Sequence, residues 1–106
     1  ASIVVRQGFA YGLDENKLVC LDLATGHRRW RGARCGWGQL ILADDLLVVQ
    51  TEPGDVLLVE ATPESYRELA RLPALKHRTW NHPALAGRIL LVRNDREAAC
   101  YELPVR

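Results

Sequence analysis

Short apolar runs separated by turn-forming residues divide the whole chain, and they constrain its fold more than any other feature. The paired runs are FAYGL and LVCLDL around DENK, LLVVQT and VLLVEA around EPGD, and RILLVR and AACYEL around NDRE. Runs of this length bounded by Gly, Pro, Asp and Asn are typical of β-strands joined by hairpins. The sequence therefore predicts an all-β fold.

The three hairpins recur at a regular spacing. Placing Asp22 on Glu60 superposes the first hairpin on the second, and placing Glu60 on Glu102 superposes the second on the third. The first of these shifts puts Tyr11 on Val49 without a gap. A period of about 40 residues with four strands per unit is the spacing expected of β-propeller blades. We predict about three antiparallel four-stranded blades, the last one incomplete.

The predicted blades cover residues 1–34, 35–74 and 75–106 and make the whole chain a partial β-propeller. Each blade has an inner strand, a central hairpin and an outer strand, and the third blade lacks its outer strand. The segment TPESYRELARL is rich in helix formers, but the repeat places an outer strand there and we predict a strand. The predicted strands are residues 2–5, 9–13, 18–22 and 27–31, then 38–42, 46–51, 56–61 and 65–71, then 79–84, 88–93 and 98–103.

The stretch CLDLATGHRRWRGAR has the densest positive charge in the chain, wrapped around Trp30. Basic residues interleaved with an aromatic ring are a pattern found in nucleic-acid surfaces. The chain as a whole has 14 basic and 13 acidic residues and a formal net charge of +1, whereas nucleic-acid-binding domains are usually strongly basic. We therefore do not expect a nucleic-acid partner.

The same stretch resembles the tryptophan-docking motif of the pyrroloquinoline-quinone-like (PQQ-like) β-propeller repeat, Ala-x-Asp-x-x-Thr-Gly-Lys-Glu-x-Trp. Asp22, Thr25, Gly26 and Trp30 match this motif, and Cys20 stands at the position of the Ala. The other two units match loosely. The resemblance implies part of a PQQ-like propeller, closest in kind to secreted or periplasmic propellers related to the lipoprotein of the outer-membrane β-barrel assembly machinery.

The spacing of these residues has a physical reason. Asp22 ends a strand, where its carboxylate can accept main-chain N–H groups of the turn, and Gly26 suits a position with positive φ. Trp30 lies on the next strand, where its ring can cover a neighbouring blade. The four residues are predicted to build a joint between blades, with the arginines on the opposite side of the strand from the ring.

Enzymatic activity is the main alternative, because quinone-dependent dehydrogenases share this repeat. The resemblance implies that such sites need calcium ligands, a catalytic Asp and in many members a disulfide between adjacent cysteines. Here no two cysteines are adjacent, and Asp44 and Asp45 fall in a predicted turn. We expect no cofactor and no catalytic residues; in the alternative, the chain is a fragment of a dehydrogenase whose ligands lie in other blades.

The three cysteines carry no motif. Cys20, Cys35 and Cys100 are odd in number and widely spaced, which is unsuited to a disulfide framework. Two of them stand among apolar neighbours, in LVCLDL and AACYEL, as buried unreactive thiols commonly do. The cysteines therefore do not indicate whether the protein works in an oxidising or a reducing compartment.

Other candidate sites are equally weak. His77 and His82 with a cysteine could ligate zinc, but no C-x-x-C or H-x-x-x-H spacing is present. Ser2 and Ser65 lack a nucleophile elbow such as G-x-S-x-G. The Gly-rich segments GWG and EPGD are unlike phosphate loops and read as the start of a blade and a hairpin turn, with Trp37 and Trp80 packed between blades.

Incomplete propellers leave the outer faces of their end blades open, because only ring closure removes exposed edges and flanks. We expect these faces to be apolar, lined by residues such as Leu42, Val48 and Leu91, and to be covered by self-association or by further blades. The chain is then a C-terminal fragment that acts as a non-catalytic scaffold and protein-interaction module. No apolar run reaches the roughly 18 residues of a membrane-spanning helix.

Overall fold

The protein is built from β-strands. The computed structural model describes residues 3–36, 38–73, 84–86, 89–93 and 98–102, with side chains in the first two ranges only. These residues form eleven strands and no helix. The prediction of an all-β fold is confirmed, and the segment rich in helix formers contributes a strand over Glu68–Leu72.

The strands form two complete four-stranded antiparallel sheets and a third sheet with three described strands. Strand order follows the sequence in the first two sheets, since each strand pairs with the one before it. In the third sheet the middle strand is β10. The first sheet contains β1 (Ile3–Arg6), β2 (Phe9–Asp14), β3 (Lys17–Asp22) and β4 (Arg28–Arg34); the second contains β5 (Gln39–Ala43), β6 (Leu46–Gln50), β7 (Val56–Glu60) and β8 (Glu68–Leu72); the third contains β9 (Ala84–Ala86), β10 (Ile89–Arg93) and β11 (Ala98–Glu102).

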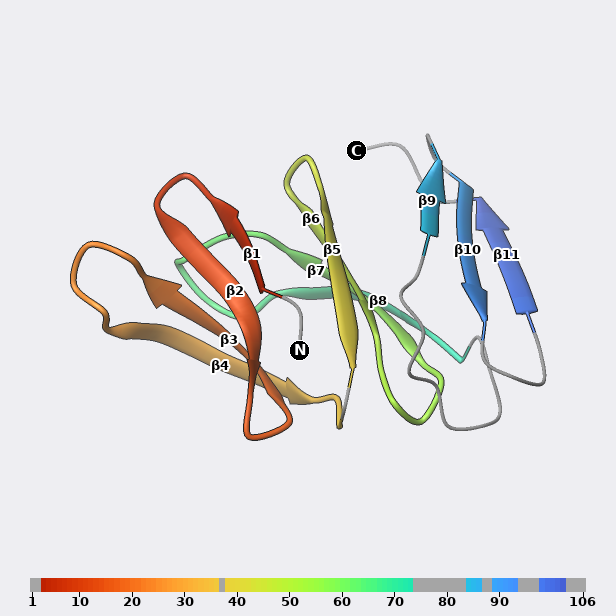
Figure 1. Ribbon diagram of the computed structural model, residues 1–106, viewed down its shortest axis with the longest axis horizontal. Coiled ribbons are helices and arrows are strands. Elements are labelled where there is room, and N and C mark those ends of the chain that lie inside the picture. The colour runs from red at the N-terminus through yellow and green to blue at the C-terminus, as the bar shows by residue number, and fades with distance from the viewer. Residues whose placement is uncertain (1–2, 37, 74–83, 87–88, 94–97, 103–106) are drawn as a thin grey trace.

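The sheets follow one another along the long axis of the molecule, with the second sheet between the other two (Figure 1). The first and second sheets pack face to face through one apolar cluster. The first sheet contributes Tyr11, Leu18 and Cys20 to this cluster, and every second residue of a strand points the same way. The second sheet contributes Leu40, Leu47, Val49, Leu57 and Val59.

This packing corrects the register of the repeat. The sequence shift superposed Tyr11 on Val49, but both residues lie in the cluster between the two sheets. They therefore lie on the two faces that pack against each other. Equivalent residues of successive units lie on the same face of their own sheets, so Tyr11 and Val49 are not equivalent. A shift of one residue moves every side chain of a strand to the opposite face. In the second strand of the unit, the predicted alignment of the two sheets differs from the observed one by such a shift.

Unequal hairpin lengths cause this shift of one residue. The pair Leu13–Leu18 of the first sheet corresponds to the pair Gln50–Val56 of the second, and the second pair encloses one residue more than the first. The shift that superposes Asp22 on Glu60 is right for the third strand of the unit and wrong for the second. With this correction, two rows of residues paired across the four strands correspond between the sheets. The first row is Ile3, Gly12, Val19 and Arg31, which matches Leu40, Val49, Leu57 and Arg71. The second row is Val5, Ala10, Leu21 and Arg28, which matches Leu42, Leu47, Val59 and Glu68.

The expected lining of the open flanks was also wrong in part. Leu42 packs against the cluster between the first two sheets, and Val48 is fully buried. Both belong to the middle sheet, which has a sheet on each side. The side chain of Leu91 lies outside those that the structure describes. Within the described residues no helix is long and apolar enough to cross a membrane.

Candidate functional site

The turn between β3 and β4 holds itself together with local hydrogen bonds. The main-chain N–H of Ala24 donates to Oδ1 of Asp22 over 2.9 Å, and the N–H of Gly26 donates to the carbonyl of Asp22 over 2.7 Å. The N–H of His27 donates to Oγ1 of Thr25 over 3.2 Å. Gly26 has a φ of 75°, the left-handed conformation that glycine adopts without strain. The turn thus fixes where β4 begins.

Trp30 joins the first sheet to the second. Its side chain is only 8% exposed, and Nε1 donates a 2.7 Å hydrogen bond to the main-chain carbonyl of Thr62, which follows β7. The indole ring lies 6.0 Å from the ring of Tyr11 in its own sheet and 5.4 Å from the ring of Tyr66, centroid to centroid. The contact with Tyr66 is edge-to-face, at 63° between the ring planes, a geometry that aromatic pairs prefer.

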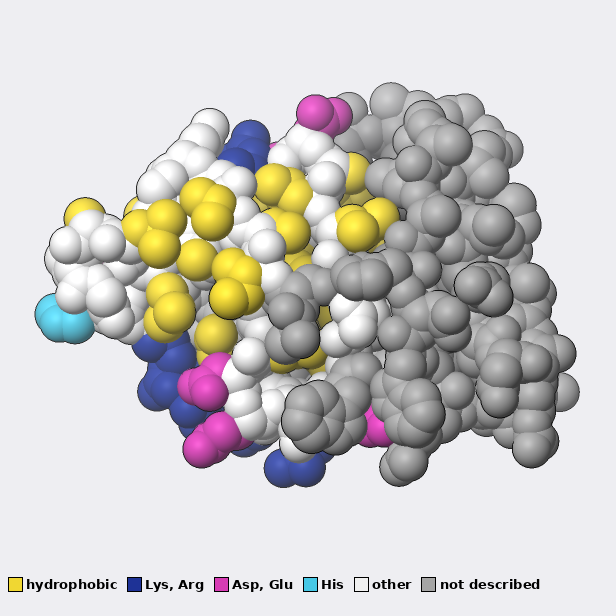
Figure 2. Space-filling view, in the orientation of Figure 1, with side chains coloured by type: hydrophobic (Ala, Val, Ile, Leu, Met, Phe, Trp, Pro, Cys, Tyr) yellow, Lys and Arg dark blue, Asp and Glu magenta, His cyan; other side chains and the backbone are white. Residues whose placement is uncertain are grey.

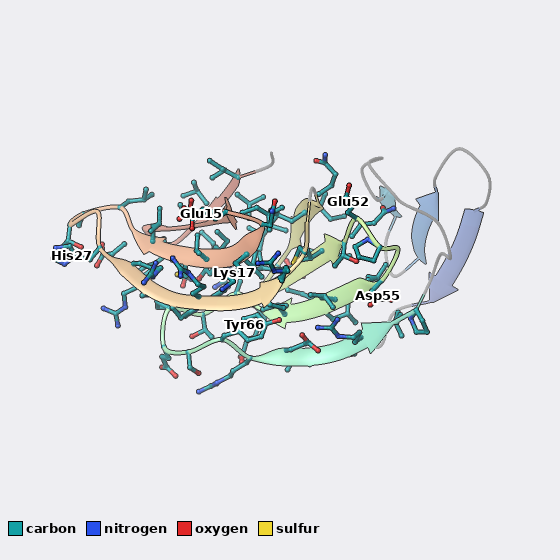
Figure 3. The ribbon with its side chains drawn as sticks, turned by 90° about the horizontal axis from the view of Figure 1, so that it is seen from below. Glu15, Lys17, His27, Glu52, Asp55 and Tyr66 are labelled. Atoms are coloured by element: carbon teal, nitrogen blue, oxygen red, sulfur yellow. The ribbon has the colours of Figure 1, made fainter. Side chains whose placement is uncertain are left out.

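Tyr66 lies close against β4 because that strand has a glycine where the ring arrives. A Cβ atom on Gly32 would collide with Cδ1 and Cε1 of Tyr66. The phenol of Tyr66 donates a 2.7 Å hydrogen bond to Oε1 of Glu68, and the pKa of Tyr66 is raised by burial and by this carboxylate. Figure 3 shows Tyr66 between β4 and β8. Glycine inside a strand commonly marks such a close approach.

Three charged side chains form what we call the paired corner of the second sheet: Asp55, Glu68 and Arg71. Arg71 Nη2 lies 3.0 Å from Oε1 of Glu68, and Nη1 lies 3.5 Å from Oδ2 of Asp55. The hydrogen bonds from Arg71 hold the pKa of Glu68 below its ordinary value, and those bonds in turn raise the pKa of Arg71. Each charged side chain of the corner therefore has an ion-pair partner within it.

The two described cysteines are buried and free. Burial raises the pKa of Cys35 to about 11, against a smaller opposing influence of Arg71, and burial also raises the pKa of Cys20. Sγ of Cys35 contacts the carbonyl of Ala33 at 3.5 Å. A thiol without thiolate character is a poor nucleophile and a poor metal ligand, so both cysteines act as small apolar residues of the core.

The prediction that the arginines lie opposite the indole ring is right for Arg28 and Arg31 of the stretch CLDLATGHRRWRGAR and wrong for Arg29, which contacts the second sheet. Cys20 pairs with Trp30 and Val19 pairs with Arg31, so the two side chains of β4 point to opposite faces. Arg28 and Arg31 are exposed, and neither forms an ion pair with any residue that the structure describes. Arg29 reaches the second sheet instead, where Nε donates to the carbonyl of Pro63 over 3.4 Å.

The remaining candidate residues that the structure describes do not assemble into a site. Among residues 3–36 and 38–73, no three His, Cys, Asp or Glu side chains are placed to hold a metal ion. Asp44 and Asp45 form the turn between β5 and β6, and Asp44 has a φ of 53°. Several predicted residues lie outside the described side chains: Ser2, Trp37, His77, Trp80, His82 and Cys100.

Sequence reasoning missed half of the joint between the sheets. It named Trp30 but not its partners Thr62 and Tyr66, which come from a connection that carries no motif. Gly32 directly follows the predicted outer strand 27–31 and lies inside the observed β4. A longer predicted strand would have made it the available signal, because a glycine inside a strand points to a close neighbour. The identity of that neighbour depends on packing between segments far apart in the sequence.

Comparison with known proteins supports the fold alone. No protein-family profile and no curated protein sequence matches the chain. The structure is similar to the computationally designed Ika8 protein, with a TM-score of 0.75 and 9% identity over 95% of this chain. It is also similar to a chain in the crystal structure of a mitotic checkpoint complex, with a TM-score of 0.77 and 15% identity over 95% of this chain. This chain covers 32% and 35% of those two chains, respectively.

Proposed function

We propose that the chain is a segment of a β-propeller of the PQQ-like repeat type and that it acts as a non-catalytic scaffold for protein interaction. The blades of this proposal are residues 1–34, 35–74 and 75–106. The observation that carries it is the joint at Trp30, where a tryptophan from the outer strand of one four-stranded sheet caps the adjacent sheet. Asp22, Thr25 and Gly26 occupy the turn that leads into that strand, as the repeat motif requires.

The similarity to solved chains about three times as long supports one part of this proposal, namely that the chain is a segment of a longer β-fold. A segment with two four-stranded sheets packed face to face has an end face that ring closure would otherwise cover. In the working protein we expect this face to be covered, by further blades or by other copies of the chain. Large exposed apolar patches commonly mark protein–protein contacts.

The test is a calorimetric titration with pyrroloquinoline quinone in the presence of Ca²⁺, on this chain and on any longer chain that carries it. A scaffold should show no heat of binding and no change in quinone absorbance. Tight binding that depends on Ca²⁺ would overturn the non-catalytic proposal and favour a dehydrogenase fragment.

A further inference from the structure

The outer face of the first sheet is the one that points away from the second sheet. Its residues correspond, position by position, to those on the face of the second sheet against which the first sheet packs, which we call the receiving face. Leu40, Val49 and Leu57 form one row of the receiving face, and Ile3, Gly12 and Val19 hold the matching positions on the outer face. In the next row, Leu42, Leu47 and Val59 match Val5, Ala10 and Leu21. The first sheet therefore has the apolar face of a receiving sheet.

This face is partly open among the described residues: three of its apolar side chains are exposed, whereas Ala10 and Val19 are buried. Ile3 is 69% exposed, Val5 is 56% exposed and Leu21 is 38% exposed, although apolar side chains of this size are usually withdrawn from water. Figure 2 shows hydrophobic side chains gathered over the first sheet, with Lys, Arg, Asp and Glu side chains at their border. The face has the composition of an interface, with an apolar centre and a polar rim.

A hollow of about 360 Å³ opens on the face, lined mainly by apolar residues that include Ile3, Val19 and Leu21. It is also lined by Gly12 and by Asp14, which pairs with Lys17 across the hairpin. Gly12 leaves this space, because the matching position of the second sheet carries Val49, which is fully buried. The hollow is thus large enough to accept an apolar side chain from an occupant.

The charged rim distinguishes the two faces. The paired corner of the second sheet contains two acids and one base, at Asp55, Glu68 and Arg71. The matching positions of the first sheet hold three bases: Lys17, Arg28 and Arg31. Lys17 corresponds to Asp55, because it precedes Leu18 as Asp55 precedes Val56. Arg28 pairs with Leu21 as Glu68 pairs with Val59, and Arg31 pairs with Val19 as Arg71 pairs with Leu57. We call these three residues the basic corner. None of them forms an ion pair with a residue that the structure describes.

The existing joint shows what lies against such a corner. The ring of Tyr66, beside Glu68 in the second sheet, packs against Gly32 of β4, and the electrostatic influence of Glu68 and Arg71 reaches Cys35, just past the end of β4. The outer strand of the arriving sheet therefore lies beside the corner of the receiving sheet. Cations covered by such a strand need carboxylates there, since a charge taken out of water without a partner is costly.

We infer that the outer face of the first sheet binds a separate antiparallel β-sheet whose outer strand carries carboxylates. This inference rests on the proposed propeller function and narrows what covers the open face. The tryptophan-bearing face of a second copy is not available for this contact, because it already packs against that copy's own second sheet.

The probe is a dye-labelled, disulfide-closed β-hairpin peptide with Trp and Leu on one face and two Glu on one strand. Its matched control has Lys in place of both Glu. Fluorescence anisotropy should show binding of the Glu hairpin and at least about tenfold weaker binding of the Lys hairpin, since charge-assisted pairs contribute enough for such a factor. Arg28→Glu and Arg31→Glu should each weaken the binding of the Glu hairpin by a similar factor.

Arg6→Glu is the matched variant, because it changes the net charge equally but lies in the row of Phe9, which packs into the core between the sheets. It should leave binding unchanged, and circular dichroism should show that all three variants fold. Failure of the Glu hairpin to bind at about 1 mM, or equal binding of both hairpins, would overturn the inference.

Light scattering separates this inference from the proposed function. A concentration-dependent oligomer that Leu21→Glu abolishes would identify a second copy as the occupant and overturn the inference, while leaving the propeller scaffold in place. A chain that binds the Glu hairpin and also binds quinone with Ca²⁺ would keep the inference and sink the scaffold proposal.

Discussion

Nε1 of Trp30 donates its hydrogen bond to the carbonyl of Thr62, a residue 32 positions further along the chain. This bond ties the outer strand of the first sheet to the connection between β7 and β8 in the second. The indole is otherwise surrounded by the rings of Tyr11 and Tyr66. Its one polar group is thus satisfied while its apolar body fills the joint, which is the arrangement a buried tryptophan needs.

Trp30→Ala should therefore strongly destabilise the fold. Removal of a buried tryptophan side chain costs about 3–5 kcal/mol, a large part of the stability of a small domain. Trp30→Phe should cost less, because it keeps part of the aromatic packing even though it loses the hydrogen bond to Thr62. Urea unfolding followed by circular dichroism at 222 nm or by tyrosine fluorescence measures the difference.

The basic residues provide the control for this prediction. Arg28→Ser with Arg31→Ser should change the free energy of unfolding by no more than about 0.5 kcal/mol, because exposed side chains without partners contribute little. A double variant as unstable as Trp30→Ala would show that the stretch stabilises the protein through its charges. The same variant should show no loss of a salt-sensitive DNA or RNA affinity, since none is expected in the parent chain.

Gly32→Ala should be destabilising by about 1–3 kcal/mol, the usual cost of overpacking a well-filled site. The new methyl group has no room beside the ring of Tyr66. In the background of Tyr66→Ala the same substitution should cost much less, and a double-mutant cycle on the free energy of unfolding measures the coupling. An equal cost in both backgrounds would contradict the close approach.

The sequence alone was sufficient for features that depend on neighbouring residues. Strand positions follow from short apolar runs and turn residues, and the β3–β4 turn follows from the local preferences of Asp22 and Gly26. Trp30 was singled out because it stands at a fixed distance from that turn. Each of these inferences needs only a few consecutive residues.

The missing features depend on three-dimensional packing. The equivalence of Tyr11 and Val49 failed because one additional residue in the second hairpin reverses the faces, and low identity between the units gave no letter match to reveal it. The paired corner at Glu68 and Arg71 was also not predicted, because outer strands with both acidic and basic side chains are common on protein surfaces. Only the packing of Tyr66 against Gly32 brings that corner to the joint.

Cys20 and Cys35 should resist alkylation in the folded protein. Both side chains are fully buried, and the pKa of each thiol is raised, to about 11 for Cys35. At pH 8 the thiolate that reacts with iodoacetamide is therefore scarce as well as inaccessible. Peptide mapping by mass spectrometry should find both cysteines unmodified in buffer and modified in guanidinium chloride; rapid labelling of either one in buffer would contradict the described core.

Glu68 should make the fold sensitive to acid. Its pKa is lowered by the hydrogen bonds from Arg71 and by that from Tyr66, so the unfolded chain takes up the proton at a higher pH than the folded chain. The stabilisation is then complete above the unfolded pKa of about 4.3 and is lost as the pH falls through the folded value. Glu68→Gln should be less stable than the parent at pH 7, and the gap should shrink as the pH is lowered to about 3. Urea midpoints at successive pH values measure this difference in stability. Arg71→Gln removes the main cause of the lowered pKa and should make the stability of the protein less dependent on pH. A difference between Glu68→Gln and the parent that stays constant down to pH 3 would show that the bonds to Glu68 do not stabilise the joint.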